Sequence, residues 1–320
     1  MRVALCQIAP VLLDRERTLD RVLAALDQID GAQLAVFGEA LVPGYPIWLD
    51  RTGGARFDAP DQKRWHARYL EQAVDLERGD LAAVQERVAA LGIHAVLGVV
   101  ERAPDRSGQT LYCTCVTLGP DGRVLSSHRK LMPTYEERLA WGTGDGAGLV
   151  VHPVGPFRLG SLNCWENWMP LARHALQAQG ETLHAAIWPG SVRNTEEWTR
   201  FAAKEGRSFV LSVGAPLRAC DVPEDLEGRA DLDLVEGAWI HDGGSCVAAP
   251  DGSWLLEPQG CCEGVFTVDL DPAAVLRERQ NFDPAGHYSR PDVLHLSVDR
   301  RRQATTSFVD ADAQCPEDRA

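Results

Sequence analysis

An α/β fold is the class that this sequence predicts, from its pattern and its composition. Short apolar runs alternate with helix-like patterns over most of the 320 residues, as expected when strands alternate with helices. Hydrophobic residues make up 45% of the chain, which is enough for a sizeable core. No repeat period and no low-complexity linker divides the sequence. We therefore expect one domain over residues 1–298 and a polar C-terminal tail over residues 299–320.

The strands are predicted from the apolar runs. Two Pro-Asp-Gly turns, in LGPDGRVL and AAPDGSWL, each indicate a hairpin between two of these strands. In chain order, the strands are expected near residues 3–9, 32–37, 94–100, 111–119, 122–127, 157–162, 183–188, 208–214, 244–249 and 264–270.

The helices are predicted from apolar residues that recur at helical spacing. In the first of them, Leu19, Val22, Leu23 and Leu26 form one apolar stripe. Helices are expected near residues 15–30, 62–76, 80–91, 165–179, 195–206 and 272–280.

The charge of the chain excludes two classes of partner. The net charge is −14, whereas proteins that bind nucleic acid or an anionic membrane need a positive face. No apolar segment approaches the length that spans a bilayer, and the N-terminus fits a first strand better than a secretory signal. We expect no nucleic-acid or membrane partner.

The cysteines indicate a reducing compartment. Nine are scattered along the chain, with no CxxC pair and no zinc-finger spacing of Cys and His. Cys113 and Cys115 alternate on a predicted strand, where they are interpreted as small core residues. We expect a cytoplasmic protein without a structural metal.

Three ionisable residues lie just beyond the carboxyl ends of predicted strands, where functional groups of α/β folds collect. Glu39 follows the run in QLAVFGEAL, Lys130 the run in GRVLSSHRKL, and Cys164 the run in FRLGSLNCWEN. Only three of the 32 basic residues are lysines. A positive charge without a specific task would therefore be an arginine in this chain, which favours a specific role for Lys130.

The three residues form a coherent set for thiol chemistry. Cys164 is the candidate nucleophile, and the N-terminus of the helix expected after it would lower the thiol pKa. Glu39 could accept the thiol proton. Lys130 and the backbone N–H of Trp165 could stabilise the charge that develops on the attacked group. Because no histidine is required, this arrangement differs from that of Cys–His proteases.

Longer motifs around these residues resemble a known family. The motifs that carry the resemblance are FGEALVPGYP, HRKLMPTYEERLAWGTGDG and GSLNCWENWMPLARHALQAQGE. The resemblance is to the nitrilase branch of the carbon–nitrogen hydrolase superfamily, and it extends in order over residues 3–298. The first motif has FGEA where relatives commonly have FPE. The resemblance implies an α-β-β-α sandwich that pairs into larger sandwiches in a homo-oligomer, as a dimer or a spiral.

The resemblance also implies a catalytic set. It assigns the Glu-Lys-Cys triad to Glu39, Lys130 and Cys164, and a second glutamate to Glu137, with its neighbour Glu136 as the alternative. No metal and no organic cofactor is implied.

The implied reaction is hydrolysis of a small-molecule nitrile to the carboxylic acid and ammonia. Tyr45, Trp141, Trp165 and Trp188 are expected to line the substrate pocket, because they lie in the motif loops and suit an apolar nitrile tail. The alternatives are an amidase or N-carbamoyl hydrolase, a cyanide-hydrolysing enzyme, or a catalytically silent binding or filament-forming protein of the same fold. The sequence leaves open whether the nitrile is aliphatic, aromatic, an arylacetonitrile or cyanide.

Overall fold

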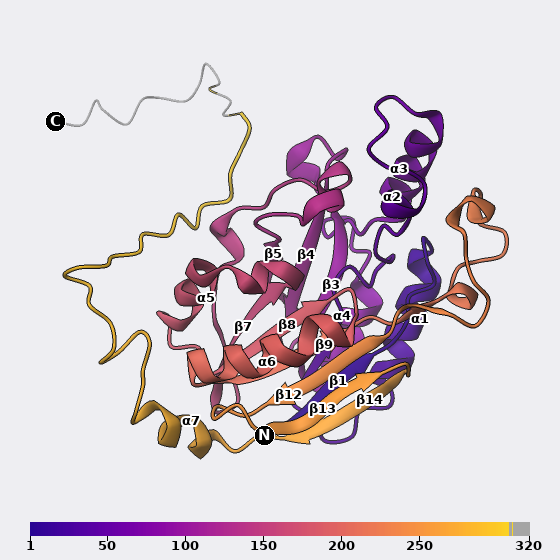
Figure 1. Cartoon of the computed structure of the whole chain (residues 1–320). Helices are drawn as coiled ribbons and strands as arrows, with labels where there is room; N and C mark the ends of the chain where they lie inside the picture. The colour runs from indigo at the N-terminus through magenta and orange to yellow at the C-terminus, as the bar shows by residue number, and fades with distance from the viewer. Residues whose placement is uncertain (307–308, 310–320) are drawn as a thin grey trace.

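Two β-sheets stacked face to face form the centre of the computed structural model, which describes residues 1–306 and 309 (Figure 1). The first sheet is mixed, with β1, β2 and β3 parallel and the other strands antiparallel to their neighbours. Its order is β14 (Gly264–Asp269), β1 (Arg2–Gln7), β2 (Leu34–Phe37), β3 (His94–Arg102), β4 (Leu111–Leu118) and β5 (Val124–Arg129).

The second sheet repeats this design, with β7, β8 and β9 parallel at its centre. Its order is β13 (Trp254–Gly260), β12 (Gly243–Ala248), β9 (Phe209–Gly214), β8 (Leu183–Trp188), β7 (Phe157–Asn163) and β6 (His152–Val154). A separate short pair joins β10 (Leu217–Arg218) to β11 (Trp239–His241).

Helices cover the outer faces of the two sheets. On the first sheet lie α1 (Arg15–Leu26) and α4 (Ala82–Leu91); on the second lie α5 (Pro170–Gln177) and α6 (Val192–Gly206). Elsewhere are the helices α2 (Trp48–Arg51), α3 (Pro60–Gln72) and α7 (Pro272–Arg279), and the 3₁₀ turns η1 (Pro104–Arg106), η2 (Tyr135–Leu139), η3 (Gly146–Gly148), η4 (Cys164–Trp168), η5 (Ala219–Asp221) and η6 (Arg229–Leu232). The expected α-β-β-α sandwich is confirmed.

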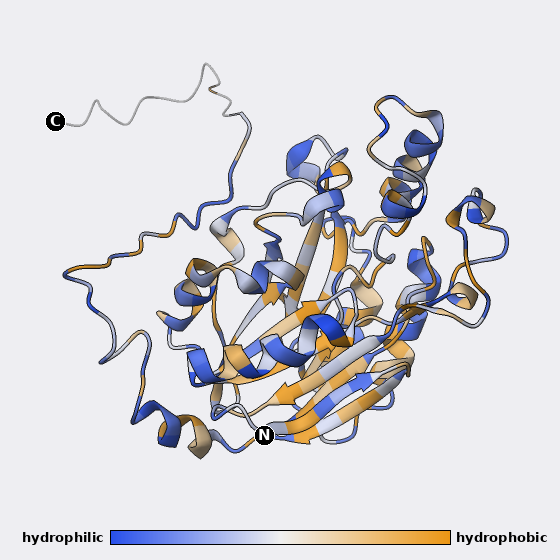
Figure 2. Ribbon diagram, viewed as in Figure 1, coloured by the Kyte–Doolittle hydropathy of each residue, from blue (hydrophilic) through white to orange (hydrophobic). Residues whose placement is uncertain are grey.

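The main core lies between the sheets. Apolar side chains from the inner faces of both sheets pack there into one buried cluster, and the strands are the most hydrophobic part of the fold (Figure 2). Burying such side chains contributes about 1.5–3 kcal/mol each. This stacking brings the ends of strands from different sheets close together, which matters for the site below.

One predicted helix is wrong in its start. The pattern over residues 165–179 predicts a continuous helix, but the chain first makes the 3₁₀ turn η4 and only then begins α5 at Pro170. Proline lacks the N–H of a helix interior and favours an extended residue before it, and Met169 is extended with φ −75° and ψ 108°. The other predicted strands and helices occur within a few residues of their expected bounds. The short elements α2, β6, β10 and β11 were not predicted.

The chain after α7 runs outside the sandwich as turns and extended backbone (Figure 1). The described part of the expected tail is attached to the body beside β5. Arg302 donates to Asp145 at 3.1 Å and to the Ser127 carbonyl at 2.8 Å, and the Gln303 N–H donates to Asp145 at 3.0 Å. Among the described residues, no helix combines the length and apolar character that crossing a membrane requires.

Candidate active site

The three residues singled out by the sequence meet at one edge of the stacked sheets. Lys130 directly follows β5 and Cys164 directly follows β7, while Glu39 lies two residues after β2. Glu39 and Lys130 therefore come from the first sheet, and Cys164 comes from the second. The site exists only because the two sheets are stacked in this register.

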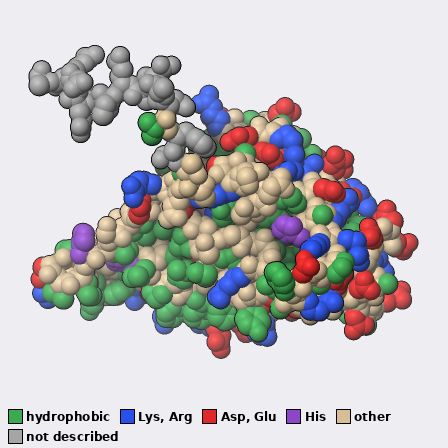
Figure 3. Space-filling model, turned by 90° about the horizontal axis from the view of Figure 1, so that it is seen from above, with side chains coloured by type: hydrophobic (Ala, Val, Ile, Leu, Met, Phe, Trp, Pro, Cys, Tyr) green, Lys and Arg blue, Asp and Glu red, His purple; other side chains and the backbone are tan. Residues whose placement is uncertain are grey.

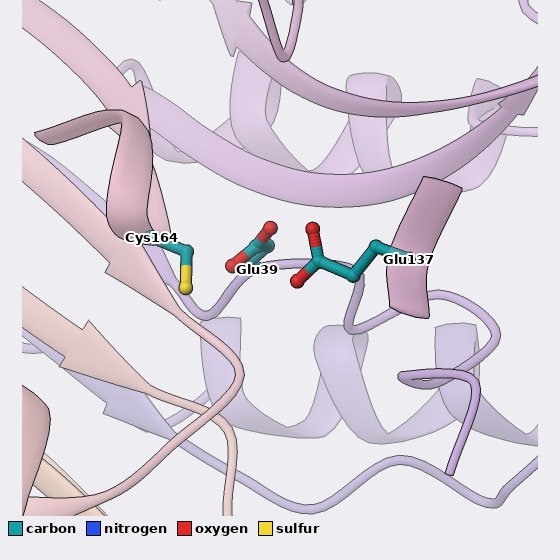
Figure 4. A group of neighbouring side chains, drawn as sticks. All are labelled: Glu39, Glu137 and Cys164. Atoms are coloured by element: carbon teal, nitrogen blue, oxygen red, sulfur yellow. The ribbon is translucent and has the colours of Figure 1, made fainter. Parts of the chain in front are cut away.

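A buried ion cluster forms the centre of the site. The Lys130 Nζ donates to Glu39 Oε1 at 2.7 Å and to Glu137 Oε2 at 2.7 Å, and the three side chains are 0%, 0% and 2% exposed. One carboxylate oxygen each of Glu39 and Glu137 and the Cys164 sulfur lie within 4.8 Å of one another. Figure 4 shows the Glu39 carboxylate between Cys164 and Glu137.

The structure separates the two candidate glutamates. Glu137 is buried, and besides Lys130 it accepts hydrogen bonds from the Thr134 N–H at 2.6 Å and the Tyr45 hydroxyl at 3.0 Å. Glu136 is partly exposed, and among the residues that the structure describes its side chain reaches only the Tyr45 hydroxyl, at 3.5 Å. The geometry therefore favours Glu137 as the second carboxylate of the site.

Burial and the neighbouring charges shift the pKa values of Glu39 and Lys130. Burial raises the pKa of Glu39 to about 7, with Lys130 opposing the shift and Glu137 adding to it. Burial alone would lower the pKa of Lys130, but the charges of Glu39, the neighbouring thiol and Glu137 raise it well above its usual value. Lys130 is therefore a permanent cation, while Glu39 titrates near neutral pH.

The expected lowering of the Cys164 pKa is wrong. Burial and the charge of Glu39 raise this pKa well above its usual value, although Lys130 and the Trp165 N–H act in the opposite direction. The turn after Cys164 is a short 3₁₀ segment rather than a long helix, and two carboxylates lie nearby. The resting thiol is protonated, so a thiolate forms only when a base takes its proton.

Cys164 itself has a backbone conformation that is uncommon for a residue with a side chain. Its φ of +44° lies in the left-handed region. This conformation turns the chain sharply between β7 and η4 and leaves the sulfur facing the carboxylates. Such outliers cluster at functional sites, where the surrounding structure holds them.

Glu166 ties the two sheets together beside the site. Its carboxylate accepts hydrogen bonds from the Leu131 N–H at 2.7 Å, next to Lys130, and from the Asn163 N–H at 3.0 Å, next to Cys164. It also pairs with His128 at 2.9 Å. Sequence reasoning missed this role. The available signal was an acidic residue two positions after the thiol, which suits a buried cap.

Glycine permits a close approach that positions Glu39. A Cβ at Gly98 in β3 would lie 2.1 Å from the Gly38 carbonyl oxygen and 2.6 Å from the Glu39 Cα. Any larger residue would displace the loop that carries Glu39. The Glu39 N–H also donates to the Trp188 carbonyl at 3.0 Å, which fixes this loop to the second sheet.

A cavity of about 400 Å³ opens onto Cys164 and Glu137. Its wall is more polar than the sequence predicts, because charged and hydrogen-bonding side chains alternate with aromatic ones. The wall includes Tyr45, Asp50, Arg51, Glu136, Trp165, Arg193, Asn194, Trp239, His241 and Asp242.

Two of the four expected pocket aromatics do not line this cavity. Tyr45 and Trp165 do. Trp141 is buried behind Tyr45 in an edge-on contact with ring centroids 5.7 Å apart. Trp188 is fully buried against Trp198 and donates to the Ser212 hydroxyl. Trp188 ends β8 and Trp141 lies two residues after η2, and both large rings are buried in the core rather than exposed to the cavity.

The acidic residues and the thiol resemble a metal-binding group in their spacing. However, the ammonium of Lys130 already lies between the carboxylates of Glu39 and Glu137, at 2.7 Å from each. That position is the one a cation would need, so the donor set fits an internal ion pair rather than a metal ion.

The stacked sheets bring together a buried thiol, an ammonium and two carboxylates, which are the groups that thiol chemistry uses. The chain belongs to the carbon–nitrogen hydrolase family, whose profile matches residues 2–279. The predicted resemblance to the nitrilase branch is confirmed. An aliphatic nitrilase of Sinorhizobium fredii (strain HH103) is 36% identical, with 93% of this chain and 95% of the relative covered. An aliphatic nitrilase of Rhodococcus rhodochrous is 32% identical, with coverages of 98% and 83%.

Solved structures share the fold. A protein of the carbon–nitrogen hydrolase superfamily from Xanthomonas campestris, with an arsenic adduct in its active site, matches with a TM-score of 0.65 and 17% identity, covering 89% of this chain and 95% of its own. A mutant amidase from Nesterenkonia sp. AN1, with acrylamide added at its active-site cysteine, matches with a TM-score of 0.60 and 22% identity, covering 88% and 97%.

The geometry of the ion cluster predicts that Lys130→Arg folds but is inactive. A planar guanidinium is wider than an ammonium and cannot take its place between two carboxylates that each lie 2.7 Å from Nζ. Displacing a catalytic group by about 1 Å can lower the rate on the order of a hundredfold, and we expect at least that loss. The measurement is ammonia release from a nitrile, with circular dichroism to verify folding.

The matched control for this variant is Lys63→Arg. Lys63 is 64% exposed and paired only with Asp58 on the surface, so its substitution should leave turnover unchanged. A Lys130→Arg variant that keeps a substantial fraction of the parent's turnover would show that Lys130 supplies charge alone.

Proposed function

We propose that the protein hydrolyses organic nitriles to the carboxylic acid and ammonia, with Cys164 as the nucleophile. The supporting observation is the buried cluster of Cys164, Glu39, Lys130 and Glu137, which reaches the cavity through Cys164 and Glu137. The chain's curated relatives named nitrilases are 32–36% identical over most of its length. Its fold neighbours include an amidase, but at 22% identity that likeness concerns the fold alone.

The first half of the reaction forms a thioimidate. Glu39 takes the proton of Cys164 as the sulfur attacks the nitrile carbon, and the proton then passes to the nitrile nitrogen. Lys130 and the Trp165 N–H stabilise the negative charge that develops on that nitrogen. Because the cluster is buried, these charges act in a medium of low dielectric constant, where they are strongest.

The second half uses two molecules of water. Glu39 removes a proton from the first water and passes it to the nitrogen as the hydroxyl adds to the thioimidate carbon. The tetrahedral species then gives its hydroxyl proton to the nitrogen, expels ammonia and leaves a thioester. A second water hydrolyses the remaining thioester, releases the acid and returns the proton to Cys164. Glu137 holds Lys130 and the Tyr45 hydroxyl in place throughout, through bonds of 2.7 and 3.0 Å.

The test is ammonia release from a panel of simple nitriles and the matching amides. We expect release from nitriles, and we expect Cys164→Ala to abolish it without changing the fold, because no other thiol lines the described cavity. Release from amides but not nitriles would favour the amidase alternative. Release from neither would favour a catalytically silent protein.

We propose further that the substrate is a small nitrile with a hydrogen-bonding group rather than an apolar tail. A cavity of about 400 Å³ limits the size, and Asn194, Arg193 and Asp242 offer polar partners along its wall.

This proposal predicts that β-hydroxypropionitrile is a better substrate than butyronitrile, which has the same number of heavy atoms. Burying the substrate hydroxyl costs little free energy when it has a hydrogen-bond partner in the wall. The methyl group of butyronitrile would instead leave polar groups of the wall without a hydrogen-bond partner. The measurement is kcat/KM for the pair, and a clear preference for butyronitrile would contradict the proposal.

We propose that the protein is a homo-oligomer that buries the outer surface of η4, α5 and α6. Hydrophobic side chains gather along one edge of the molecule (Figure 3). The exposed residues of η4, α5, α6 and the link between η4 and α5 include Trp165, Trp168, Met169, Leu171 and Phe201. The ring of Trp168 stacks on that of Phe201 and makes a tilted contact with that of Trp165. Exposed apolar patches of this kind mark interaction surfaces.

Leu171→Asp tests this surface. Leu171 is 65% exposed near the start of α5, where an aspartate is compatible with the helix, so the variant should fold but lose apolar contact area. By light scattering we expect the parent to exceed the 35.0 kDa of one chain and Leu171→Asp to shift toward it. Leu276→Asp, at a leucine of α7 that is 76% exposed, is the control. A monomeric parent would refute the proposal.

We also propose a cytoplasmic location. All eight cysteines in the described part of the chain are free thiols, several of them on the surface, as expected in a reducing compartment.

A further inference from the structure

A second thiol lies inside the site and has no part in the reaction described above. Cys113, in the middle of β4, is buried, and its Sγ lies 3.0 Å from Glu39 Oε1 and 3.8 Å from Asn163 Oδ1. A thiol has one proton to donate, and a nearer, negatively charged oxygen is the stronger acceptor. The S–H group therefore points to Glu39.

The two oxygens of Glu39 have different surroundings. Oε1 receives both the Lys130 ammonium at 2.7 Å and the Cys113 thiol at 3.0 Å. Oε2 is equally buried but accepts no hydrogen bond from any residue that the structure describes. When one oxygen of a carboxylate accepts two hydrogen bonds, the other oxygen remains free to accept a proton.

We propose that Cys113 is a positioning residue for Glu39: its S–H group occupies Oε1 together with Lys130 and leaves Oε2 as the oxygen that receives the Cys164 proton. In the reaction the proton moves from the Cys164 sulfur to Oε2 and from there to the substrate nitrogen. Cys113 keeps its own proton, forms no covalent bond and undergoes no change in oxidation state.

Cys113 is suited to this role because it stays protonated. Burial and the charge of Glu39 raise the pKa of the Cys113 thiol well above its usual value. The group is thus a permanent donor over the working pH range. Its hydrogen bond stabilises the ionised form of Glu39 and so lowers the Glu39 pKa, against the larger effect of burial.

The sign of the expected effect follows from this hydrogen bond. Glu39 can accept a proton only when it is ionised, so activity should rise with pH through a midpoint near 7. Removing the Cys113 donor makes ionisation of Glu39 harder and moves that midpoint upward. The titratable groups that face Glu39 are Lys130 after β5, Glu137 on η2, Cys164 on η4 and Cys113 on β4, with the phenols of Tyr45 and Tyr69 farther away.

The experiment compares Cys113→Ala and Cys113→Ser with the parent. We expect Cys113→Ala to raise the midpoint of the acid limb of kcat/KM by about one pH unit, as loss of a hydrogen bond to a charged group would. Cys113→Ser restores a donor at the same place, so its midpoint should return to that of the parent or lie below it. A residue that only fills space would alter kcat without moving the midpoint.

The matched controls are Cys115→Ala and Cys115→Ser. Cys115 is also buried on β4, two residues along, but its thiol lies 3.3 Å from the Ser161 hydroxyl rather than on Glu39. These variants should keep the parent's midpoint. An unchanged midpoint in Cys113→Ala, or the same midpoint in the Ala and Ser variants, would overturn the proposal.

The kcat/KM measurement rests on the proposed nitrile hydrolysis. A second readout tests the role of Cys113 without it. Alkylation of Cys164 by iodoacetamide needs no nitrile, but because the buried thiol is protonated at rest, it needs ionised Glu39 to take the thiol proton. Its rate, followed by mass spectrometry of the peptide that contains Cys164, should rise through the same midpoint and shift in the same order among the variants. If no nitrile is hydrolysed but the alkylation midpoints shift as expected, the proposed function fails and the role of Cys113 stands.

Discussion

The buried ammonium of Lys130 between two carboxylates is the interaction on which the rest of the site depends. Taking such charges out of water costs several kcal/mol for each ion unless the geometry of the pair is good. The contacts of 2.7 Å to Glu39 and Glu137 meet that requirement. The same burial gives Glu39 a pKa near 7 and keeps the Cys164 thiol protonated at rest. Burial therefore makes Glu39 a base that works near neutral pH, and it also makes a base necessary, because the Cys164 thiol does not ionise by itself.

The end of β5 shows how the fold supports this cluster. Three successive basic residues, His128 and Arg129 at the end of the strand and Lys130 just after it, are all buried and paired with different carboxylates. His128 pairs with Glu166, Arg129 with Glu101 and Asp105, and Lys130 with Glu39 and Glu137. Glu166 also accepts hydrogen bonds from the backbone N–H of Leu131, next to Lys130, and of Asn163, next to Cys164. The second sheet therefore cannot move away from the first without breaking hydrogen bonds to this buried carboxylate.

The sequence predicts the sandwich and most of its elements because apolar runs and helical stripes follow the local geometry of strands and helices. It also predicts Glu39, Lys130 and Cys164, since the ends of parallel strands are where α/β folds collect functional groups. It fails where the outcome depends on distant packing. The rings of Trp141 and Trp188 are taken up by the core, and the thiol pKa rises because burial and two carboxylates outweigh the turn that follows Cys164. The approach of Cys113 to Glu39 is likewise set by how the strands pair.

The wall of the cavity has a different origin from its floor. Much of the wall comes from three separate stretches of loops and element ends, residues 45–51, 189–194 and 239–242. The floor, in contrast, is built around strand ends that buried charges hold in place. Loops tolerate change far better than a packed and charged core does. Substitutions and insertions in the wall can therefore redirect the enzyme to other nitriles without disturbing the groups that do the chemistry. The buried charged groups are thus fixed by the core, while the cavity wall can vary. This separation makes the protein a practical starting point for directed evolution.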